Sequence, residues 1–290
     1  MGMTINTNLA ANNAYLNLSR TQADMSKSMA KLSSGLRINT AADDAAGLAI
    51  SEGLRSQVNG NNIAARNAQD GVNVLQTAEG ALTEVHSILQ RVRDLAVQAG
   101  NDSNNTDSRA AITTEVTGLV EELSRLAENT NFNGINLLQG ATSGPAADGK
   151  LTFQVGAGST ANDQIEVDLG AMTGADIKTL ATDLKAAIVT TDGFASSATA
   201  LTTLATVDTA IKDVSTARSS LGAVTNRFQH AINSLQVTAQ NLSAAQSHIT
   251  DTDMAQEMVT YTKDSIIAQA GTAILAQANQ SGQGVLKLLG

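Results

Sequence analysis

Three groups of residues have types and spacings that could carry chemistry. A glycine-rich stretch, Gly156-x-Gly158-x-x-Ala161, has the spacing of a dinucleotide-binding loop. Histidine is a common metal ligand, and paired carboxylates can act as acid and base. The histidines and the adjacent carboxylates are His86, His230, His248, Asp43-Asp44 and Glu121-Glu122. Each group would form a site only if the elements around it position it for that role.

The glycine-rich stretch is placed poorly for a cofactor. A dinucleotide loop must be followed by a helix, because the helix N-terminus holds the pyrophosphate. Residues 151–155 and 164–169 instead alternate between apolar and polar side chains, which predicts two strands. The glycines between them therefore predict the loop of a β-hairpin.

The histidines and the carboxylate pairs favour structural roles. No two histidines have the four-residue spacing of zinc ligands on one helix face. Neighbouring residues on a helix point about 100° apart, so neither carboxylate pair is a preformed catalytic pair. We expect Asp43-Asp44 at a helix N-terminus, where the helix dipole favours negative charge. The sequence therefore predicts no enzyme activity, no cofactor and no metal.

The composition suits long paired helices better than a thick globular core. Aromatic residues make up 2% of the 290 residues, the single proline is Pro145, and cysteine is absent. Helices can therefore run far without a break. The lack of cysteine excludes a disulfide scaffold, a thiolate zinc site and a thiol nucleophile, and fits a protein of the cytosol or one that works outside the cell without disulfides.

Charge and hydropathy limit the classes of partner. A net charge of −9 and a pI near 4.7 do not attract phosphate backbones, so we expect no nucleic-acid partner. No apolar run approaches the roughly 18–20 residues of a membrane span, so we expect no membrane insertion. The first residues lack the basic start and apolar stretch of a cleaved secretory signal. An extracellular location would require another export route.

The most regular pattern is a seven-residue ladder from Val207 to Ile249. Because an α-helix turns about every 3.6 residues, a step of seven returns to nearly the same face. The large apolar rungs are Val207, Val214, Leu221, Phe228, Leu235, Leu242 and Ile249. A second column of mostly small residues follows three positions later, at Ala210, Ala217, Val224, Ala231, Thr238 and Ala245. Two such columns form a narrow coiled-coil seam, which needs a partner from the same chain or from another copy.

Three further stretches alternate steps of four and three residues. Their positions are Ala11, Tyr15, Leu18, Gln22, Met25, Met29, Leu32 and Leu36; Ala78, Leu82, Val85, Leu89, Val92, Ala96 and Ala99; and Ile112, Val116, Leu119, Leu123 and Leu126. The fold is therefore predicted to be mainly α, with long N- and C-terminal helices paired as a coiled-coil-like rod and a small β-hairpin region in the middle. Residues 78–99 are the expected partner of the ladder, which would make it an intramolecular spine.

One apolar residue lies beside a seam rather than in it. Leu95 follows Arg91 by one helical turn. Additional packing between helices is the favoured interpretation of Leu95. A contact for another subunit, or for a foreign receptor, is the alternative.

Two sets of motifs, one near each end of the chain, occur in the order found in a known family. They are residues 31–39 (KLSSGLRIN), 43–50 (DDAAGLAI), 70–82, 89–98, 221–228 (LGAVTNRF), 249–254 and 269–280 (QAGTAILAQANQ). Through these motifs the sequence resembles the bacterial flagellins over roughly residues 4–175 and 205–289. It departs from many of them in lacking a proline near residues 281–284 and in carrying extra residues before Thr4.

The resemblance implies a structural subunit that self-assembles into the flagellar filament for motility, outside the cell, after export by the flagellar apparatus without a cleaved signal peptide. It implies an inner filament-core domain (1–42 and 255–290), a rod domain (43–175, which includes the hairpin, and 201–254) and a short variable segment (176–200) where the outer domain is nearly absent. The implied filament-core residues are Leu18, Met25, Met29, Leu32, Met258, Ile267, Ile274 and Leu286, and the implied rod-seam residues are Leu82, Val85, Leu89, Val92, Leu221, Phe228, Leu235 and Leu242.

The resemblance also implies partners. Other copies of the chain come first, followed by an export chaperone, the filament cap and hook-junction proteins. Some flagellins are ligands of Toll-like receptor 5, and the positions that match their contact are Arg91, Leu95 and Glu115. A protein that joins the hook to the filament, within the same family, is the alternative function.

Overall fold

The computed structural model describes residues 8–139, 149–169, 177–190 and 194–289, with the backbone alone for residues 189–190 and 281–289. Helices make up most of this part of the chain, as predicted. They are α1 (Leu9–Ser34), α2 (Ala45–Ala99), α3 (Thr106–Asn129), α5 (Ile177–Lys185), α6 (Ser197–Thr250) and α7 (Met254–Leu289), with a π-helical turn, Ala186–Thr190, after α5.

Two small antiparallel strand pairs complete the fold. β3 (Lys150–Gln154) pairs with β4 (Gln164–Asp168) in a register that places Phe153 opposite Ile165, which confirms the predicted hairpin. A second pair, β1 (Asn131–Phe132) and β2 (Ile135–Asn136), follows α3 directly. Its two-residue turn has positive φ at Asn133 (50°) and Gly134 (80°), a conformation that asparagine and glycine tolerate best.

The chain forms two compact units, and the division between them falls within α2 and α6. The central unit is Asn59–Ala239, and the terminal unit consists of Met1–Val58 and Gln240–Gly290. Each unit has its own packing. The inner and rod domains implied by the family resemblance are defined by where residues lie in a filament. These compact units of a single chain do not test their boundaries, which stay predictions.

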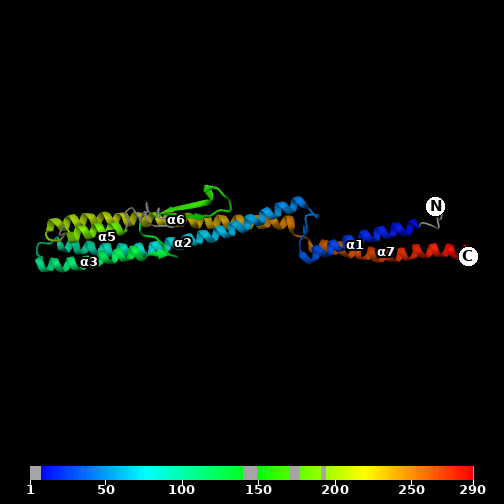
Figure 1. The fold of residues 1–290 in the computed structure, drawn as a ribbon, viewed down its shortest axis with the longest axis horizontal. Helices are drawn as coiled ribbons and strands as arrows, with labels where there is room; N and C mark the ends of the chain where they lie inside the picture. The colour runs from blue at the N-terminus through cyan, green and yellow to red at the C-terminus, as the bar shows by residue number, and fades with distance from the viewer. Residues whose placement is uncertain (1–7, 140–148, 170–176, 191–193, 290) are drawn as a thin grey trace. The chain divides into compact units, whose positions relative to one another are not determined.

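In the central unit, α2, α3, α5 and α6 pack side by side around one apolar core (Figure 1). The residues that α2 buries include Ala64, Ala68, Val72, Leu75, Ala78, Leu82, Val85, Leu89, Val92, Ala96 and Ala99, and α6 buries Val207, Ala210, Val214, Ala217, Leu221, Val224 and Phe228. The first four rungs of the ladder are thus covered within the chain, while Leu235 is half-buried. Exposed ion pairs on this unit, such as Arg91–Glu115, contribute little beside this burial.

Two elements close this core at its sides. α5 lies on α3 through Leu180 and Leu184, flanked by the ion pairs Lys178–Glu128 (3.0 Å) and Lys185–Glu121 (3.2 Å). The buried line of α3 differs from the predicted one, because Val120 and Ala127 are buried while Leu119 and Leu126 are half-buried. A helix inside a four-helix core buries a wider stripe than a two-stranded seam does.

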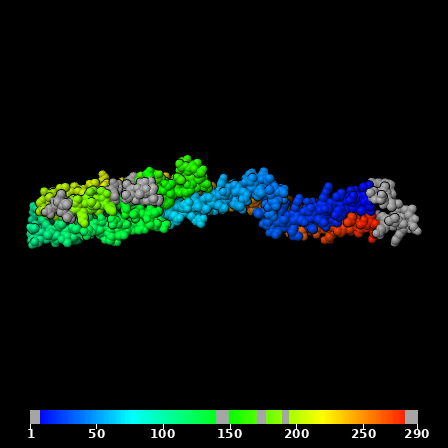
Figure 2. Space-filling model, in the orientation of Figure 1, coloured from blue at the N-terminus to red at the C-terminus, as the bar shows by residue number. Residues whose placement is uncertain are grey.

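The hairpin covers α2 where α2 carries glycine. A Cβ added to Gly71 would lie 2.9 Å from Phe228 Cζ and 3.3 Å from Phe153 Cδ1, so the two rings occupy the space of the missing side chain. The loop after β3 lies over Gly60 in the same way, with Ala157 Cβ 2.7 Å from such a Cβ. Figure 2 shows the hairpin, in green, standing out from the surface of the central unit.

In the terminal unit, α1 and α7 run side by side in opposite directions (Figures 1 and 2). Asn8 caps α1, accepting a hydrogen bond from the Ala11 amide, and donates its side-chain N–H to the carbonyl of Ala278 on α7 (2.9 Å). Gly35 ends α1 in the left-handed conformation at φ 73°.

Candidate functional site

The seam between α1 and α7 is lined mainly by small and polar side chains. The covered or half-covered positions, spaced by three and four residues, are Ala11, Ala14, Leu18, Thr21, Met25, Ser28 and Leu32 on α1, and Tyr261, Ser265, Ala268, Gly271, Leu275 and Ala278 on α7. Leu18 lies against Gly271, where an added Cβ would be 3.3 Å from Leu18 Cδ1. The two helices therefore approach each other closely.

The α1 seam differs by one residue from the predicted one at three positions. The structure covers Ala14, Thr21 and Ser28 in place of Tyr15, Gln22 and Met29. Tyr15 is 60% exposed and Met29 is 52% exposed. The close approach of α7 selects the small column of α1, and the neighbouring large column points away from it.

Large apolar side chains instead cover the outward faces of both helices. Eleven of the fifteen exposed large apolar residues of the described chain lie in the terminal unit, and they are Leu9, Tyr15, Leu16, Met29, Ile50, Met254, Met258, Val259, Ile266, Ile267 and Ile274. On α7, Met258, Val259 and Ile266 line a shallow groove with Thr262 and Lys263. Exposed large apolar side chains gathered in one unit in this way are typical of a site of protein association.

The terminal unit has almost no core of its own to balance these faces. Within its described side chains, residues 8–58 and 240–280, only Leu18 and Ile38 are buried apolar residues. We refer to the ten of these residues that lie on α1 and α7, that is all of them except Ile50 of α2, as the outward apolar faces. They are the candidate functional site.

Backbone hydrogen bonds join the two connections at the other end of this helix pair. The Arg37 amide donates to the Thr250 carbonyl (2.6 Å), and the Thr252 amide donates to the Gly35 carbonyl (3.0 Å). The Arg37 guanidinium adds a bond to the Ile249 carbonyl (2.7 Å). This two-strand contact sets where α1 ends relative to α7.

The carboxylates singled out in the sequence cap helices and turns. Asp44 Oδ1 accepts from the Gly47 amide (2.9 Å) at the start of α2, which confirms the predicted helix N-terminus. Asp43 Oδ2 accepts from the Asn39 amide and from the amide and hydroxyl of Thr40. The Thr40 backbone bond is the largest cause that lowers the pKa of Asp43. Glu121 and Glu122 instead pair with Lys185 and Arg125.

The glycine-rich stretch is a hairpin loop, as predicted. The segment after its glycines is one 3-10 turn, Ala161–Asp163, followed directly by β4, so no α-helix N-terminus faces a ligand there. Asp163 occupies the space beside Gly156 and Gly158 and accepts from the amide (3.0 Å) and hydroxyl (2.7 Å) of Thr160. These bonds, the hydroxyl first, lower the pKa of Asp163.

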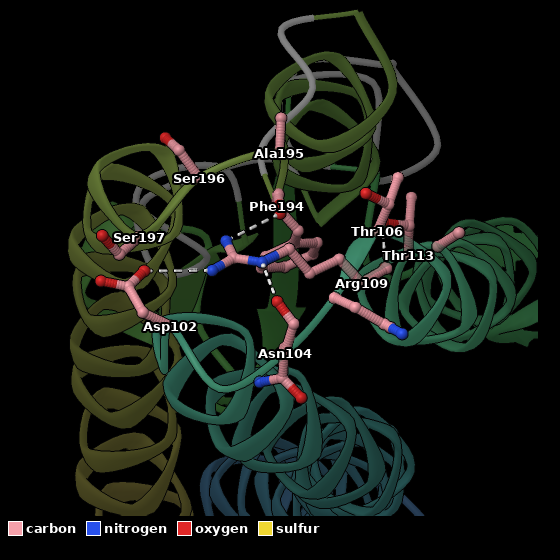
Figure 3. A pocket seen from close by; sticks show the side chains of 11 residues that line it. Asp102, Asn104, Thr106, Arg109, Thr113, Phe194, Ala195, Ser196 and Ser197 are labelled. Atoms are coloured by element: carbon pink, nitrogen blue, oxygen red, sulfur yellow. Dashed lines mark hydrogen bonds and ion pairs between the residues drawn. The ribbon is translucent and has the colours of Figure 1, made fainter.

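A polar cavity of about 550 Å³ lies where the loop between α2 and α3 meets the start of α6 (Figure 3). Arg109 is at its centre, with a side chain only 11% exposed. Its guanidinium donates to the carbonyls of Asn104 and Phe194 (both 3.3 Å) and to Asp102. Arg109 therefore joins the loop after α2 to the turn before α6. The sequence did not indicate this role, because Phe194 lies 85 residues from Arg109 in the chain.

Arg91 and Glu115 form an ion pair of 2.6 Å between α2 and α3, and their side chains are 55% and 45% exposed. Leu95, in contrast, is 3% exposed and belongs to the core. The three residues thus lie together, but only the charged pair is on the surface.

The predicted rod-seam and filament-core residues and the three histidines differ in how far the structure buries them. The rod-seam residues Leu82, Val85, Leu89, Val92, Leu221 and Phe228 are buried, and Leu235 and Leu242 are half-buried. Of the filament-core residues, Leu18 is buried, Met25 and Leu32 are half-buried, Met29, Met258, Ile267 and Ile274 are exposed, and the side chain of Leu286 lies outside the described part. His230 and His248 are exposed, and His86 Nε2 lies 2.9 Å from Gln90 Nε2.

The described residues contain neither a cluster of metal-binding side chains nor a membrane-spanning helix. No group of three or more histidine, aspartate and glutamate side chains is arranged to hold a metal ion there. No helix in the same part of the chain has the length and hydropathy needed to span a membrane.

Comparisons with known proteins agree on one family. Residues 5–143 match the family model described as the bacterial flagellin N-terminal helical region, and residues 204–289 match the bacterial flagellin C-terminal helical region. A flagellin of Halalkalibacterium halodurans is 46% identical over 287 residues, which cover 99% of this chain and 100% of that protein. The flagellar filament 33 kDa core protein of Treponema phagedenis is 41% identical over 291 residues, which cover the same shares.

A solved structure shares the fold. It is a flagellar hook-associated protein from Vibrio parahaemolyticus, with a TM-score of 0.58 over 72% of this chain and 100% of that one. Its sequence identity to this chain is 14%, so this likeness concerns the fold alone.

Proposed function

Because the chain belongs to the bacterial flagellin family and is by that membership a structural subunit of the extracellular flagellar filament, we propose that it polymerises through the outward apolar faces of α1 and α7. Neighbouring copies cover these faces in the filament, and the inner filament-core domain of residues 1–42 and 255–290 is the part that they enclose. The central unit supplies the rod, and residues 176–200 take the place of a larger outer domain.

One observation carries this proposal. The terminal unit exposes eleven large apolar side chains and buries two apolar residues within its described side chains. Full burial of one large apolar side chain contributes about 1.5–3 kcal/mol, whereas fixing the backbone costs about 1–2 kcal/mol per residue. An isolated pair of helices with so little burial is marginal, so the neighbours in a filament complete the folding of this unit.

The central unit behaves differently because it has its own core. Phe228, Leu82 and Leu89 are fully buried within the chain and need no neighbour. We therefore expect a soluble subunit with a folded central unit and mobile terminal helices, which become ordered on assembly.

Deletion of residues 255–290 tests the proposal. The truncated chain should keep the cooperative unfolding of the central unit and lose polymerisation, measured by electron microscopy of seeded and unseeded samples. The matched control is Lys212→Ala, at an exposed position of α6 in the central unit, which should leave filaments intact. Filaments of normal length from the chain that lacks residues 255–290 would overturn the proposal.

The alternative of a junction protein between hook and filament is not favoured. The relatives that match nearly the whole chain at 41–46% identity are named as a flagellin and a filament core protein. The hook-associated structure is 14% identical to this chain, so its similarity supports the fold and not the function.

We further propose a purely structural role and a particular export route. The carboxylate pairs form capping bonds and ion pairs, and the glycine-rich stretch is a hairpin loop, which fits a structural role. Family membership supports export by the flagellar apparatus without a cleaved signal peptide, with an export chaperone, the filament cap and hook-junction proteins as partners. Mass spectrometry of the secreted subunit tests the route, because a cleaved leader would shorten the N-terminal peptide.

A second proposed activity is recognition by Toll-like receptor 5 through Arg91 and Glu115. The exposed ion pair between α2 and α3 supports it, and Leu95 then acts from within the core by holding that surface in place. Arg91→Ala should leave assembly unchanged and reduce receptor signalling by monomers. Arg125→Ala, which breaks a comparable exposed pair with Glu122, is the matched control. Unchanged signalling by Arg91→Ala would exclude this contact.

A further inference from the structure

The sequence contains two Asn-Gly pairs, and the fold places them in opposite settings. Asn59-Gly60 lies within α2, while Asn133-Gly134 forms the two-residue turn between β1 and β2. We propose that Asn133 is a site of spontaneous covalent modification, converting to aspartate and isoaspartate through attack by the next backbone nitrogen. Asn59 is protected from the same reaction by its helix.

The reaction needs only the chain and water. The backbone nitrogen of Gly134 loses its proton and attacks Asn133 Cγ, so a nitrogen–carbon bond forms. The bond between Cγ and Nδ2 breaks, and the side-chain nitrogen takes up a proton and leaves as ammonia. Water then opens the resulting five-membered succinimide at either carbonyl. One opening gives aspartate, and the other gives isoaspartate, in which the main chain runs through Cγ.

The turn leaves both reacting groups accessible. Asn133 is exposed, and it is the one non-glycine residue with positive φ among the residues that the structure describes. Within that same part of the chain, neither its side chain nor the Gly134 amide has a hydrogen-bond partner. Gly134 is exposed, and a Cβ added to it would meet no atom within 4 Å, so the space beside its α-carbon is open.

The helical pair lacks this access. In an α-helix the Gly60 amide donates to the carbonyl four residues earlier, and the backbone dihedrals are fixed. The hairpin loop also covers the site, with Ala157 Cβ 2.7 Å from a Cβ built on Gly60. Reaction at Asn59 therefore requires local opening of α2, and every 1.4 kcal/mol of opening free energy slows it about ten-fold.

The modification alters the turn in two ways. Aspartate adds a negative charge to the turn. Isoaspartate adds a carbon to the main chain of a turn that has room for two residues, which opposes the register Phe132↔Ile135. Leu137 and Leu138, both fully buried, follow within a few residues, so the isoaspartate form should loosen this corner of the central core.

The full-length chain, incubated in mildly alkaline water enriched in heavy oxygen, tests the proposal. Peptide mapping by mass spectrometry follows the conversion of each asparagine, and the heavy oxygen separates conversion during incubation from conversion during digestion. In the folded chain, Asn133 should convert at least about ten-fold faster than Asn59. In denaturant, the two should convert at comparable rates.

Two results would overturn the proposal. One is an unmodified Asn133 in the folded chain after the time in which the denatured chain reacts. The other is equal conversion of Asn59 and Asn133 in the folded chain. Asn133→Gly supplies a matched control, because glycine tolerates positive φ and has no side-chain amide to close a ring. This variant should unfold like the parent chain and lose isoaspartate labelling by an isoaspartyl methyltransferase, and retained labelling would place the modification elsewhere.

Discussion

Leu18 of α1 lies directly against Gly271 of α7, with 3.3 Å between Leu18 Cδ1 and the position that a Cβ on Gly271 would take. Leu18 is also one of the two buried apolar residues among the described side chains of the terminal unit. Leu18 therefore packs into the space that the missing side chain of Gly271 leaves open, and a larger residue at position 271 would meet it.

Gly271→Val should separate α1 from α7 and reduce filament formation. The added methyl groups have no room beside Leu18, and overpacking of this kind typically costs about 1–3 kcal/mol. Gly53→Val is the control, because nothing lies within 4 Å of a Cβ at Gly53, in the same unit. Sedimentation of polymer measures the outcome, and equal polymer yields from both variants would contradict the role of Gly271.

Val259→Asp should abolish or strongly shorten filaments while the central unit stays folded. Val259 is 70% exposed on α7, and a carboxylate there cannot be buried by a neighbour without a large desolvation cost. Thr260→Asp adds the same charge at the next, exposed but polar position and should have a smaller effect. Electron microscopy measures the number and length of filaments that each variant forms. Intact Val259→Asp filaments would show that this face is not covered by neighbours.

Phe228→Ala should destabilise the central unit by about 3–5 kcal/mol, because the fully buried ring would leave a cavity. The Phe153 ring meets it edge-on, with centroids 5.4 Å apart, and Phe153 is only half-buried. Phe153→Ala should therefore cost less. Denaturant unfolding gives both values, and a double-mutant cycle should show a coupling of about 0.5–1.5 kcal/mol. A coupling near zero would show that the two rings pack independently.

Acidification should release the hairpin loop as Asp163 becomes protonated. Hydrogen bonds from Thr160 lower the pKa of Asp163 in the folded chain. The stabilising contribution is therefore present above the unfolded pKa of about 3.9 and is lost as the pH falls through the lower folded value. The amide signals of Thr160 and Gly158, followed by NMR, should shift together below the unfolded pKa. Asp163→Asn should remove that shift, and an unchanged titration in this variant would point to another carboxylate.

Arg91→Ala should change the free energy of unfolding by no more than about 1 kcal/mol. Its pair with Glu115 is 55% and 45% exposed, and water screens such pairs. Chemical denaturation of the central unit gives the value. A loss of several kcal/mol would mean that this pair holds α2 and α3 together, and any loss of receptor signalling would then have a structural cause.

The helices and the β3–β4 hairpin were predictable because their signals are local. The seven-residue ladder and the period-two stretches report the repeat of the backbone itself, and neither needs knowledge of distant contacts. Asp44 at the start of α2 follows the same logic, since a cap bonds within one turn.

The parts that depend on distant partners were not predictable. On α1, Ala14 and Tyr15 stand in neighbouring columns with nearly the same spacing, and hydrophobicity favours Tyr15. The structure covers Ala14 and exposes Tyr15, and which of the two columns is covered depends on where α7 lies. Arg109 is similar, since its contact with the Phe194 carbonyl joins residues 85 positions apart.

The outward apolar faces also bear on how a polymer of this chain can grow. Because α1 and α7 each carry such faces on sides that the other helix does not cover, a neighbour that covers one side brings with it an uncovered copy of the other. In the proposed assembly such a contact does not close on itself, so the tip of the polymer presents the same unfinished surface after every addition. Length is then limited by the supply of subunits rather than by the geometry of the subunit.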